Sequence, residues 1–129
     1  MTYSPEGLDS LTFLDVMPRF RDGSDTPRAY LERCLAVIDD REPVVKAWVV
    51  LNPSGAREAA DASTERYRRG RSISSIDGMP IGIKDLIETK DMPTGHGCAA
   101  FAGNHTRRDS ARGRSRSIKL THISSRVRS

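Results

Sequence analysis

A single lysine, Lys84, stands inside a short apolar run and is the best-placed residue for chemistry in this sequence. The run 81–87 is apolar apart from Lys84, Asp85 and one glycine, and turn signals at 77–78 and 92–93 bound it. Burial in such a strand disfavours the charged form of a lysine, and a neutral amine accepts protons. Lys84 is therefore a candidate general base. The alternative is a strand-end lysine whose ammonium reaches the solvent.

Two motifs lie around this lysine, DGMPIGIKD at residues 77–85 and MPTGHGC at residues 92–98. Together they resemble the start of the amidase signature family. The resemblance extends over residues 8–111, because an upstream helix, a strand and an alanine-rich helix follow in the family's order. It implies that Lys84 is the base of a Ser-Ser-Lys triad that hydrolyses carbon–nitrogen bonds in linear amides. The implied substrate is a small-molecule amide, whose identity this part of the sequence does not specify.

The resemblance also implies that the two catalytic serines lie further along a full-length chain, in a stretch rich in glycine and serine. We therefore expect an N-terminal fragment of the domain, truncated before the nucleophile and inactive alone. A serine hydroxyl needs an activating base and an oxyanion hole to act as a nucleophile. The pairs Ser74-Ser75 and Ser124-Ser125 lack flanking glycines, and neither stands in the family's position. We assign neither pair as catalytic.

A second group of candidate site residues follows the lysine. Thr94, Gly95, Gly97 and Cys98 align with a loop that borders the catalytic cavity in the family, where serine is usual at position 98. The glycines would let the backbone approach a ligand closely. A plain surface turn is the alternative. A cysteine nucleophile at Cys98 would need a base, and nothing in the sequence places one beside it.

The charge of the chain is divided unevenly along its length. Residues 1–109 contain all 17 acidic residues and 15 of the 21 basic ones, whereas residues 110–129 contain six basic residues and no acid. The net charge of +4 is therefore the sum of +6 on the tail and −2 on the body, and the body does not have the basic composition of a nucleic-acid-binding domain.

We divide the chain into residues 1–111, the N-terminal part of an amidase signature domain, and residues 112–129, a basic tail. The tail has no apolar period, so we expect it to be disordered. Two explanations compete: a genuine basic arm that binds polyanions, or a reading frame lost near Ala111. The alternative function is accordingly a small basic binding protein that contacts nucleic acid or an acidic partner. A third hypothesis is an inactive remnant.

Several classes of protein are excluded by simple counts. With two cysteines, Cys34 and Cys98, and no secretory signal, we expect a reduced, cytoplasmic protein. No stretch approaches the roughly 20 apolar residues of a membrane span, so no membrane partner is expected. The three histidines lack ligand spacing, so we expect no metal and no cofactor.

The resemblance implies an α/β fold, namely the opening helices and first strands of an amidase signature domain, which as a whole has a mixed sheet flanked by helices. Apolar residues from Leu8 to Met17 predict a first helix that Pro18 limits. Further helices are expected over 27–41, after the N-cap Thr26, and from Asn52 to Gly70, with arginines turned to water. The strands 44–51 and 81–87 read as buried on both faces. Because the chain has few elements to cover them, we expect self-association through the uncovered strands.

Overall fold

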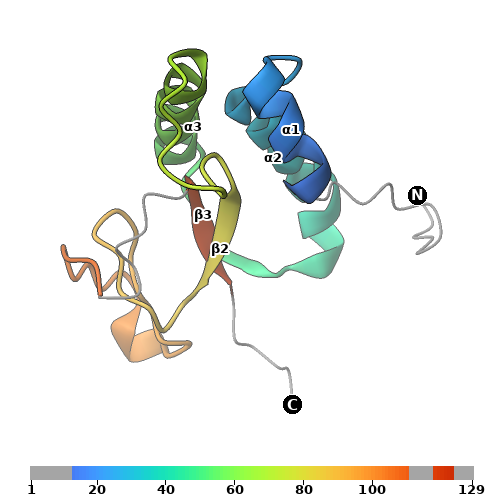
Figure 1. Cartoon of the computed structure of the whole chain (residues 1–129). Helices are drawn as coiled ribbons and strands as arrows, with labels where there is room; N and C mark the ends of the chain where they lie inside the picture. Colours follow the sequence, from blue (N-terminus) through green and yellow to red (C-terminus); the bar gives the residue numbers. More distant parts are fainter. Residues whose placement is uncertain (1–12, 111–117, 124–129) are drawn as a thin grey trace.

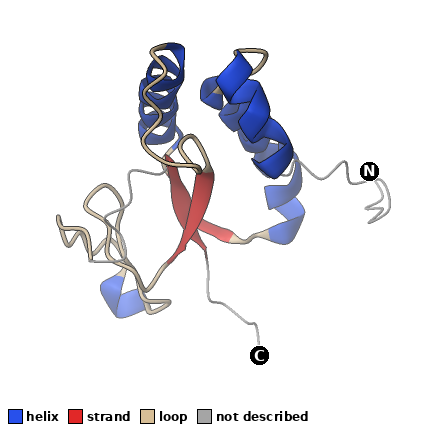
Figure 2. Ribbon diagram, viewed as in Figure 1, coloured by secondary structure: helices blue, strands red, loops and turns tan. Residues whose placement is uncertain are grey.

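The computed structural model describes residues 13–110 and 118–123 (Figure 1). Its elements follow the order α1–α2–β1–α3–β2–η2–β3, and the sheet has the strand order β1-β3-β2. β3 runs antiparallel to β1 and parallel to β2, so the sheet is mixed. Figure 2 shows the long helices on one side of the sheet, while residues 85–110 form a largely irregular segment beyond β2. The predicted α/β class is confirmed.

Helix α1, Phe13–Asp22, continues through Pro18, the residue predicted to limit it. Its buried residues Val16 and Phe20 pack against Tyr30 of the next helix. The free energy gained by burying these side chains outweighs the loss of the main-chain hydrogen bond that a proline removes from a helix. Leu8 and Leu11 lie outside the described residues.

Helix α2, Pro27–Val45, starts as predicted but ends later. The Thr26 side chain accepts the Ala29 N–H at 3.1 Å, which is the expected N-cap. The helix continues through Pro43 and stops at Lys46, whose φ of 50° and N–H bond to the Glu42 carbonyl close the last turn. Residues 44 and 45 are therefore helical, and the expected strand 44–51 is reduced to β1, Trp48–Leu51. Helical continuity overrides the local β propensity of two valines.

Helix α3, Pro53–Arg68, is the element that the sequence predicts best. The Asn52 side chain caps it by accepting the Gly55 N–H at 3.0 Å. Ala56 and Ala60 are fully buried and pack against Leu31 of α2, so small side chains bring the two helices together. None of the helices in the described part of the chain is long and apolar enough to cross a membrane.

The outer strands of the sheet are not covered on both faces, contrary to expectation. β2 spans Pro80–Lys84 and ends earlier than the predicted run 81–87, because the chain turns there and the Ile87 N–H donates to the Lys84 carbonyl at 2.9 Å. Val49 and Leu51 of β1 are exposed, as is Gly82 of β2. One face of the sheet is therefore left open by the described residues.

The central strand β3, Ile118–Ile123, comes from the tail that was expected to be disordered. It lies between β1 and β2, with a register irregularity against each neighbour. The structure differs from the prediction because strand pairing depends on main-chain hydrogen bonds and not on apolar periodicity. β1 and β2 are not paired with each other, and the extended segment 118–123 gives both of them a partner. The remaining tail residues, 112–117 and 124–129, lie outside the described residues.

Candidate functional site

A buried carboxylate anchors the turn that leads into β2. Asp77 accepts two hydrogen bonds from the Arg66 guanidinium, at 2.9 and 2.6 Å, and one from the Ser63 hydroxyl at 2.8 Å. A fourth comes from the Ile73 N–H at 3.2 Å. Burial alone raises the pKa of Asp77, but these donors outweigh it and the pKa is lowered. The start of the lysine-bearing strand is thus tied to α3.

Lys84 is the last residue of β2, and its side chain is exposed. Its neighbour Ile83 is buried, as the alternation of side chains along a strand requires. The sequence analysis expected Lys84 inside a buried run, but the structure places it on the open face of the sheet. The reason is that the described residues supply no second layer over that face.

The residue after Lys84 fastens the loop 94–98 to the end of β2. Asp85 is only 2% exposed. Its Oδ1 accepts the Gly95 N–H at 2.7 Å, and its Oδ2 accepts the Gly97 N–H at 3.3 Å. The Asp85 carbonyl also accepts the His96 N–H at 3.0 Å. Three consecutive backbone amides of the loop therefore converge on one residue.

Within this loop, Thr94 is buried and Cys98 is exposed. The Thr94 N–H donates to the Asn104 carbonyl at 2.9 Å, while the Thr94 Oγ1 has no hydrogen-bond partner among the described residues. The Cys98 N–H donates to the Gly95 carbonyl at 3.0 Å and precedes the short 3₁₀ turn η2, Ala99–Phe101. Of the four predicted loop residues, Gly95 and Gly97 thus contact the residue that follows Lys84, whereas Thr94 and Cys98 bond to Asn104 and Gly95.

The serine pairs remain unassigned. Ser74 and Ser75 lie in an exposed turn before Asp77, where the Ser74 hydroxyl accepts the Ile76 N–H at 3.3 Å. The pair 124–125 lies outside the described residues. Within the described ranges, no three His, Cys, Asp or Glu side chains gather where they could hold a metal ion.

Sequence reasoning missed both aspartates as anchors. It treated Asp77 as a turn signal and Asp85 as a neighbour of the candidate base. It also assigned Arg66 to the solvent, although this side chain is only 28% exposed and pairs with Asp77. A signal was available, because an aspartate next to an apolar run needs hydrogen-bond donors when it is buried.

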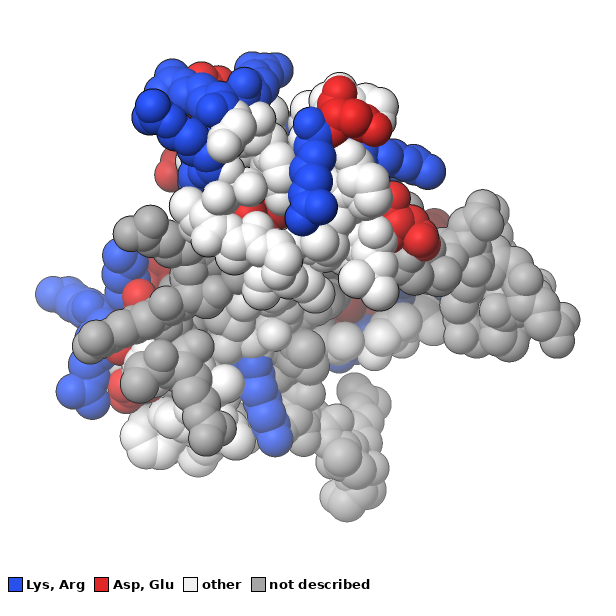
Figure 3. Space-filling model, in the orientation of Figure 1, with Lys and Arg blue, Asp and Glu red and all other residues white. Residues whose placement is uncertain are grey.

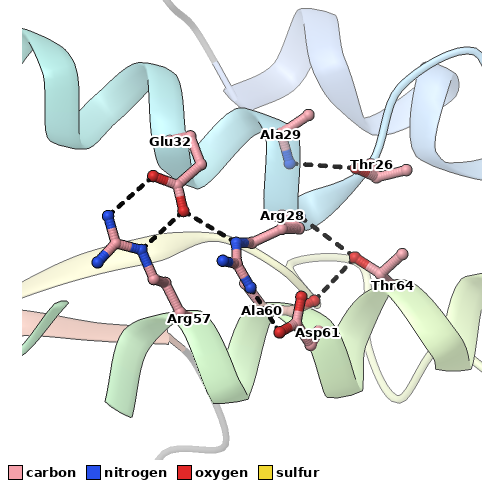
Figure 4. A network of polar contacts seen from close by, with 8 residues as sticks. All are labelled: Thr26, Arg28, Ala29, Glu32, Arg57, Ala60, Asp61 and Thr64. Atoms are coloured by element: carbon pink, nitrogen blue, oxygen red, sulfur yellow. Dashed lines mark hydrogen bonds and ion pairs between the residues drawn. The ribbon is translucent and has the colours of Figure 1, made fainter. Parts of the chain in front are cut away.

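A separate polar network joins α2 to α3 (Figure 4). Glu32 accepts hydrogen bonds from Arg57, at 2.8 and 3.0 Å, and from Arg28 at 2.9 Å. Arg28 also reaches Asp61 at 2.5 Å. The bonds from Arg57, with a smaller contribution from Arg28, lower the pKa of Glu32 to about 2 against the raising effect of burial. This network is structural, because its charges are paired with one another.

A groove of about 350 Å³ lies beside this network, between α2 and the start of α3. Its lining includes Leu35, Ile38 and Leu51, with the paired Glu32 and Arg57. No residue of the segment 84–98 lines it, so the groove is distinct from the Lys84 region.

Basic side chains gather over the C-terminal end of α3 (Figure 3). Here Arg69 pairs with Glu65 at 2.7 Å, and Arg68 lies 3.8 Å from the same carboxylate. Ion pairs therefore offset part of the positive charge at this helix end.

A sequence model of the amidase family matches residues 29–112. The chain belongs to the amidase family. The matched range contains Lys84, Asp85 and the loop 94–98, and it ends before β3. The family resemblance inferred from the two motifs is confirmed.

Two curated amidase-family relatives are glutamyl-tRNA(Gln) amidotransferase A subunits. That of Chloroflexus aggregans is 49% identical over 72 residues, which are 56% of this chain and 15% of the relative. That of Chloroflexus aurantiacus is 40% identical over 96 residues, which are 74% of this chain and 20% of the relative. A peptide amidase solved with the inhibitor chymostatin has the same fold over 93% of this chain and 25% of its own, with a TM-score of 0.77 and 23% identity.

The chain therefore spans at most about a fifth of the length of these amidotransferase subunits. The described part of this chain contains one strand end, one loop and the helices that hold them. The remaining four fifths of an amidotransferase A subunit have no counterpart in it.

Proposed function

We propose that this chain carries the lysine base of an amidase that hydrolyses the carbon–nitrogen bond of linear amides. The observation that supports this most strongly is the convergence of Lys84 and the loop 94–98 on Asp85, within the range matched by the family. The proposed substrate is a small-molecule amide, and the proposed setting is the cytoplasm.

In the proposed mechanism, the neutral Lys84 amine accepts a proton from a bridging serine. That serine deprotonates the nucleophilic serine, whose oxygen attacks the amide carbon. The amine leaves with a proton, and water then hydrolyses the acyl-enzyme. Both serines would come from the remainder of a full-length amidase. General-base catalysis of this kind contributes about 10²–10⁴-fold to a rate.

The open face of the sheet fits this proposal. Lys84 is exposed here, and only further chain laid over β2 would remove water from its amine. Loss of hydration favours the neutral form, which is the form a general base needs. We therefore propose that the base becomes competent when the sheet is covered.

A hybrid protein tests this function. Residues 29–112 of this chain would replace the equivalent part of the Chloroflexus aurantiacus amidotransferase A subunit, which is 40% identical over 96 residues. Ammonia release from primary amides should persist in the hybrid, and Lys84→Ala should lower kcat by at least about 10²-fold.

The matched control is Lys90→Ala, which removes another exposed lysine from the same segment and should leave kcat unchanged. Equal activity of the hybrid and its Lys84→Ala variant would contradict the proposal. The 129-residue chain alone should release no ammonia above its own Lys84→Ala variant.

Self-association is a second part of the proposal. Val44, Val45 and Val49 are exposed apolar side chains at the end of α2 and on β1. Apolar surface of this kind is commonly covered by another part of a protein or by another chain. We expect the isolated chain to elute in size-exclusion chromatography as a concentration-dependent oligomer. A monomer at every concentration would contradict this expectation.

A further inference from the structure

Asp85 accepts hydrogen bonds from three consecutive backbone amides of the loop that follows β2. Its carboxylate oxygens each accept a backbone N–H, from Gly95 and from Gly97, and its carbonyl accepts that of His96. These three donors belong to the main chain of one loop, so Asp85 constrains the path of that loop. Hydrogen bonds to a carboxylate are about twice as strong as those between neutral groups.

The loop adopts a backbone path that needs such support. His96 has a φ of 52° and Gly97 a φ of 68°, so two successive residues are left-handed. A non-glycine residue seldom takes this conformation unless its surroundings impose it. The three N–H groups that point at Asp85 provide that constraint.

The fit between carboxylate and loop is close. A Cβ added at Gly95 would lie 3.1 Å from the Asp85 Oδ2, a separation tighter than most real contacts. The loop therefore lies close enough to the carboxylate that a Cβ at position 95 would crowd it. Lys84 is exposed while Asp85 is buried, so the two neighbouring side chains have different surroundings.

We propose that Asp85 is the positioning residue that sets where the loop 94–98 lies relative to Lys84. This inference rests on the proposed function for its catalytic meaning, because the loop is then a wall of the substrate cavity and Lys84 the base. Asp85 itself takes no part in proton transfer. Its hydrogen bonds with the Gly95, His96 and Gly97 amides, which we call the clamp, join the strand end to the loop backbone.

Amide hydrogen exchange measured by NMR on the 129-residue chain tests the inference. Asp85→Asn keeps the shape of the side chain and removes its charge. We expect the Gly95, His96 and Gly97 amides to exchange at least about tenfold faster, as loss of a charge-assisted hydrogen bond implies. Amides of α2 and α3 should keep their exchange rates. Asp39→Asn, the same chemical change at an exposed position of α2, is the control and should leave the loop unchanged.

Unchanged exchange at residues 95–97 in Asp85→Asn would overturn the inference. Equal acceleration throughout the chain would overturn it too, because Asp85 would then support the whole fold and not position the loop. If Asp85→Asn does not fold, Gly95→Ala tests the same contact from the loop side. Its Cβ should push the carboxylate away and speed exchange at 96 and 97, and no change there would count against the clamp.

The two proposals fail separately. Lys84→Ala should leave exchange of the loop amides unchanged, since the clamp does not involve the amine. If ammonia release by the hybrid does not depend on Lys84 but loop exchange rises in Asp85→Asn, the proposed function is refuted and the clamp stands. If ammonia release depends on Lys84 but loop exchange does not change in Asp85→Asn, the clamp is refuted and the proposed function stands.

Discussion

The helical part of this molecule and the segment after β2 are held together in different ways. Between α2 and α3, Leu31, Ala56 and Ala60 are almost completely buried against one another. In residues 80–110 the buried apolar side chains are few, with Ile83 and Met92 as examples. Main-chain hydrogen bonds and buried polar groups take their place. The first region is stabilised by removal of apolar surface from water, the second by polar contacts of fixed geometry.

This difference predicts two kinds of response to mutation. Changes in the helical part should lower the free energy of unfolding of the whole chain. Changes in the loop segment should alter local structure and leave most of that free energy intact. The polar anchor Asp77 lies where the two regions meet, because α3 provides its side-chain donors and β2 follows it.

The largest effect is expected at that junction. Arg66→Met should lower the free energy of unfolding by about 3–5 kcal/mol, because it leaves the buried Asp77 carboxylate without its charged partner. Urea unfolding followed by circular dichroism measures the change. Arg69→Met removes an exposed arginine of the same helix end, which pairs with Glu65, and should cost less than about 1 kcal/mol. Equal losses of unfolding free energy in the two variants would show that the Arg66–Asp77 pair has no special role at the junction.

The same pair should make stability depend on pH. The pKa of Asp77 is lowered in the folded state from its ordinary value of 3.8. Its contribution is therefore fully present above that value and is lost as the pH falls through the folded pKa. Unfolding at a series of pH values from about 5 to about 3 should show this decline in the parent chain and less of it in Arg66→Met. An identical decline in both chains would assign the effect to other carboxylates.

A core truncation sharpens the comparison from the helical side. Leu31 is completely buried between α2 and α3, so Leu31→Ala should cost about 2–5 kcal/mol. Leu14→Ala, at a side chain that is 76% exposed, should change stability by less than about 0.5 kcal/mol. Thermal unfolding of both variants gives the result. A small loss for Leu31→Ala would mean that the helix pair is loosely packed.

Two glycines, one in the turn before β2 and one in the turn after η2, separate crowding from backbone strain. Gly78 and Gly103 both have positive φ, at 89° and 76°. A Cβ at Gly78 would lie 2.9 Å from the Cγ of Pro27, whereas nothing lies within 4 Å of one at Gly103. Gly78→Ala should therefore cost about 1–3 kcal/mol, and more than Gly103→Ala, in which strain alone acts. Matching losses would show that the turn can move away from α2.

The smallest effect is expected inside the loop. Thr94→Val replaces a buried hydroxyl that has no hydrogen-bond partner among the described residues by a methyl group of similar size. Stability should stay the same or rise by up to about 1 kcal/mol, because an unsatisfied polar group is removed. A clear loss, measured by the same urea titration, would show that this hydroxyl has a partner.

How far the sequence predicts this structure depends on the range of the interactions involved. The start of α2 at Thr26 and the whole of α3 were predictable, because caps and helical periodicity depend only on residues close together in the sequence. The end of β2 and the helical state of Val44 were not, because they depend on where the chain turns in space. The family motifs located Lys84 and the loop. They did not reveal the open sheet face, which depends on what lies beyond the strand.

Asp77 and Asp85 show the same limit in the site. Each was visible in the sequence, but their donors come from Arg66, eleven residues away, and from Gly95, ten residues away. No local pattern connects them. A rule that every aspartate bordering an apolar run needs donors would have raised the question, though it would not have named the donors.

The position of β3 has a consequence for the order of folding. Trp48 pairs with Ile123, and Pro80 with Ile118, so the middle of the sheet joins segments from across most of the chain. Contacts between such distant segments form slowly, since the entropy of closing a long loop is lost before any pairing compensates it. Helices α2 and α3 are joined by a short connection and have no such delay. We expect pulse-labelled amides of the helix pair to gain protection first, and those of all three strands to follow together as one late event.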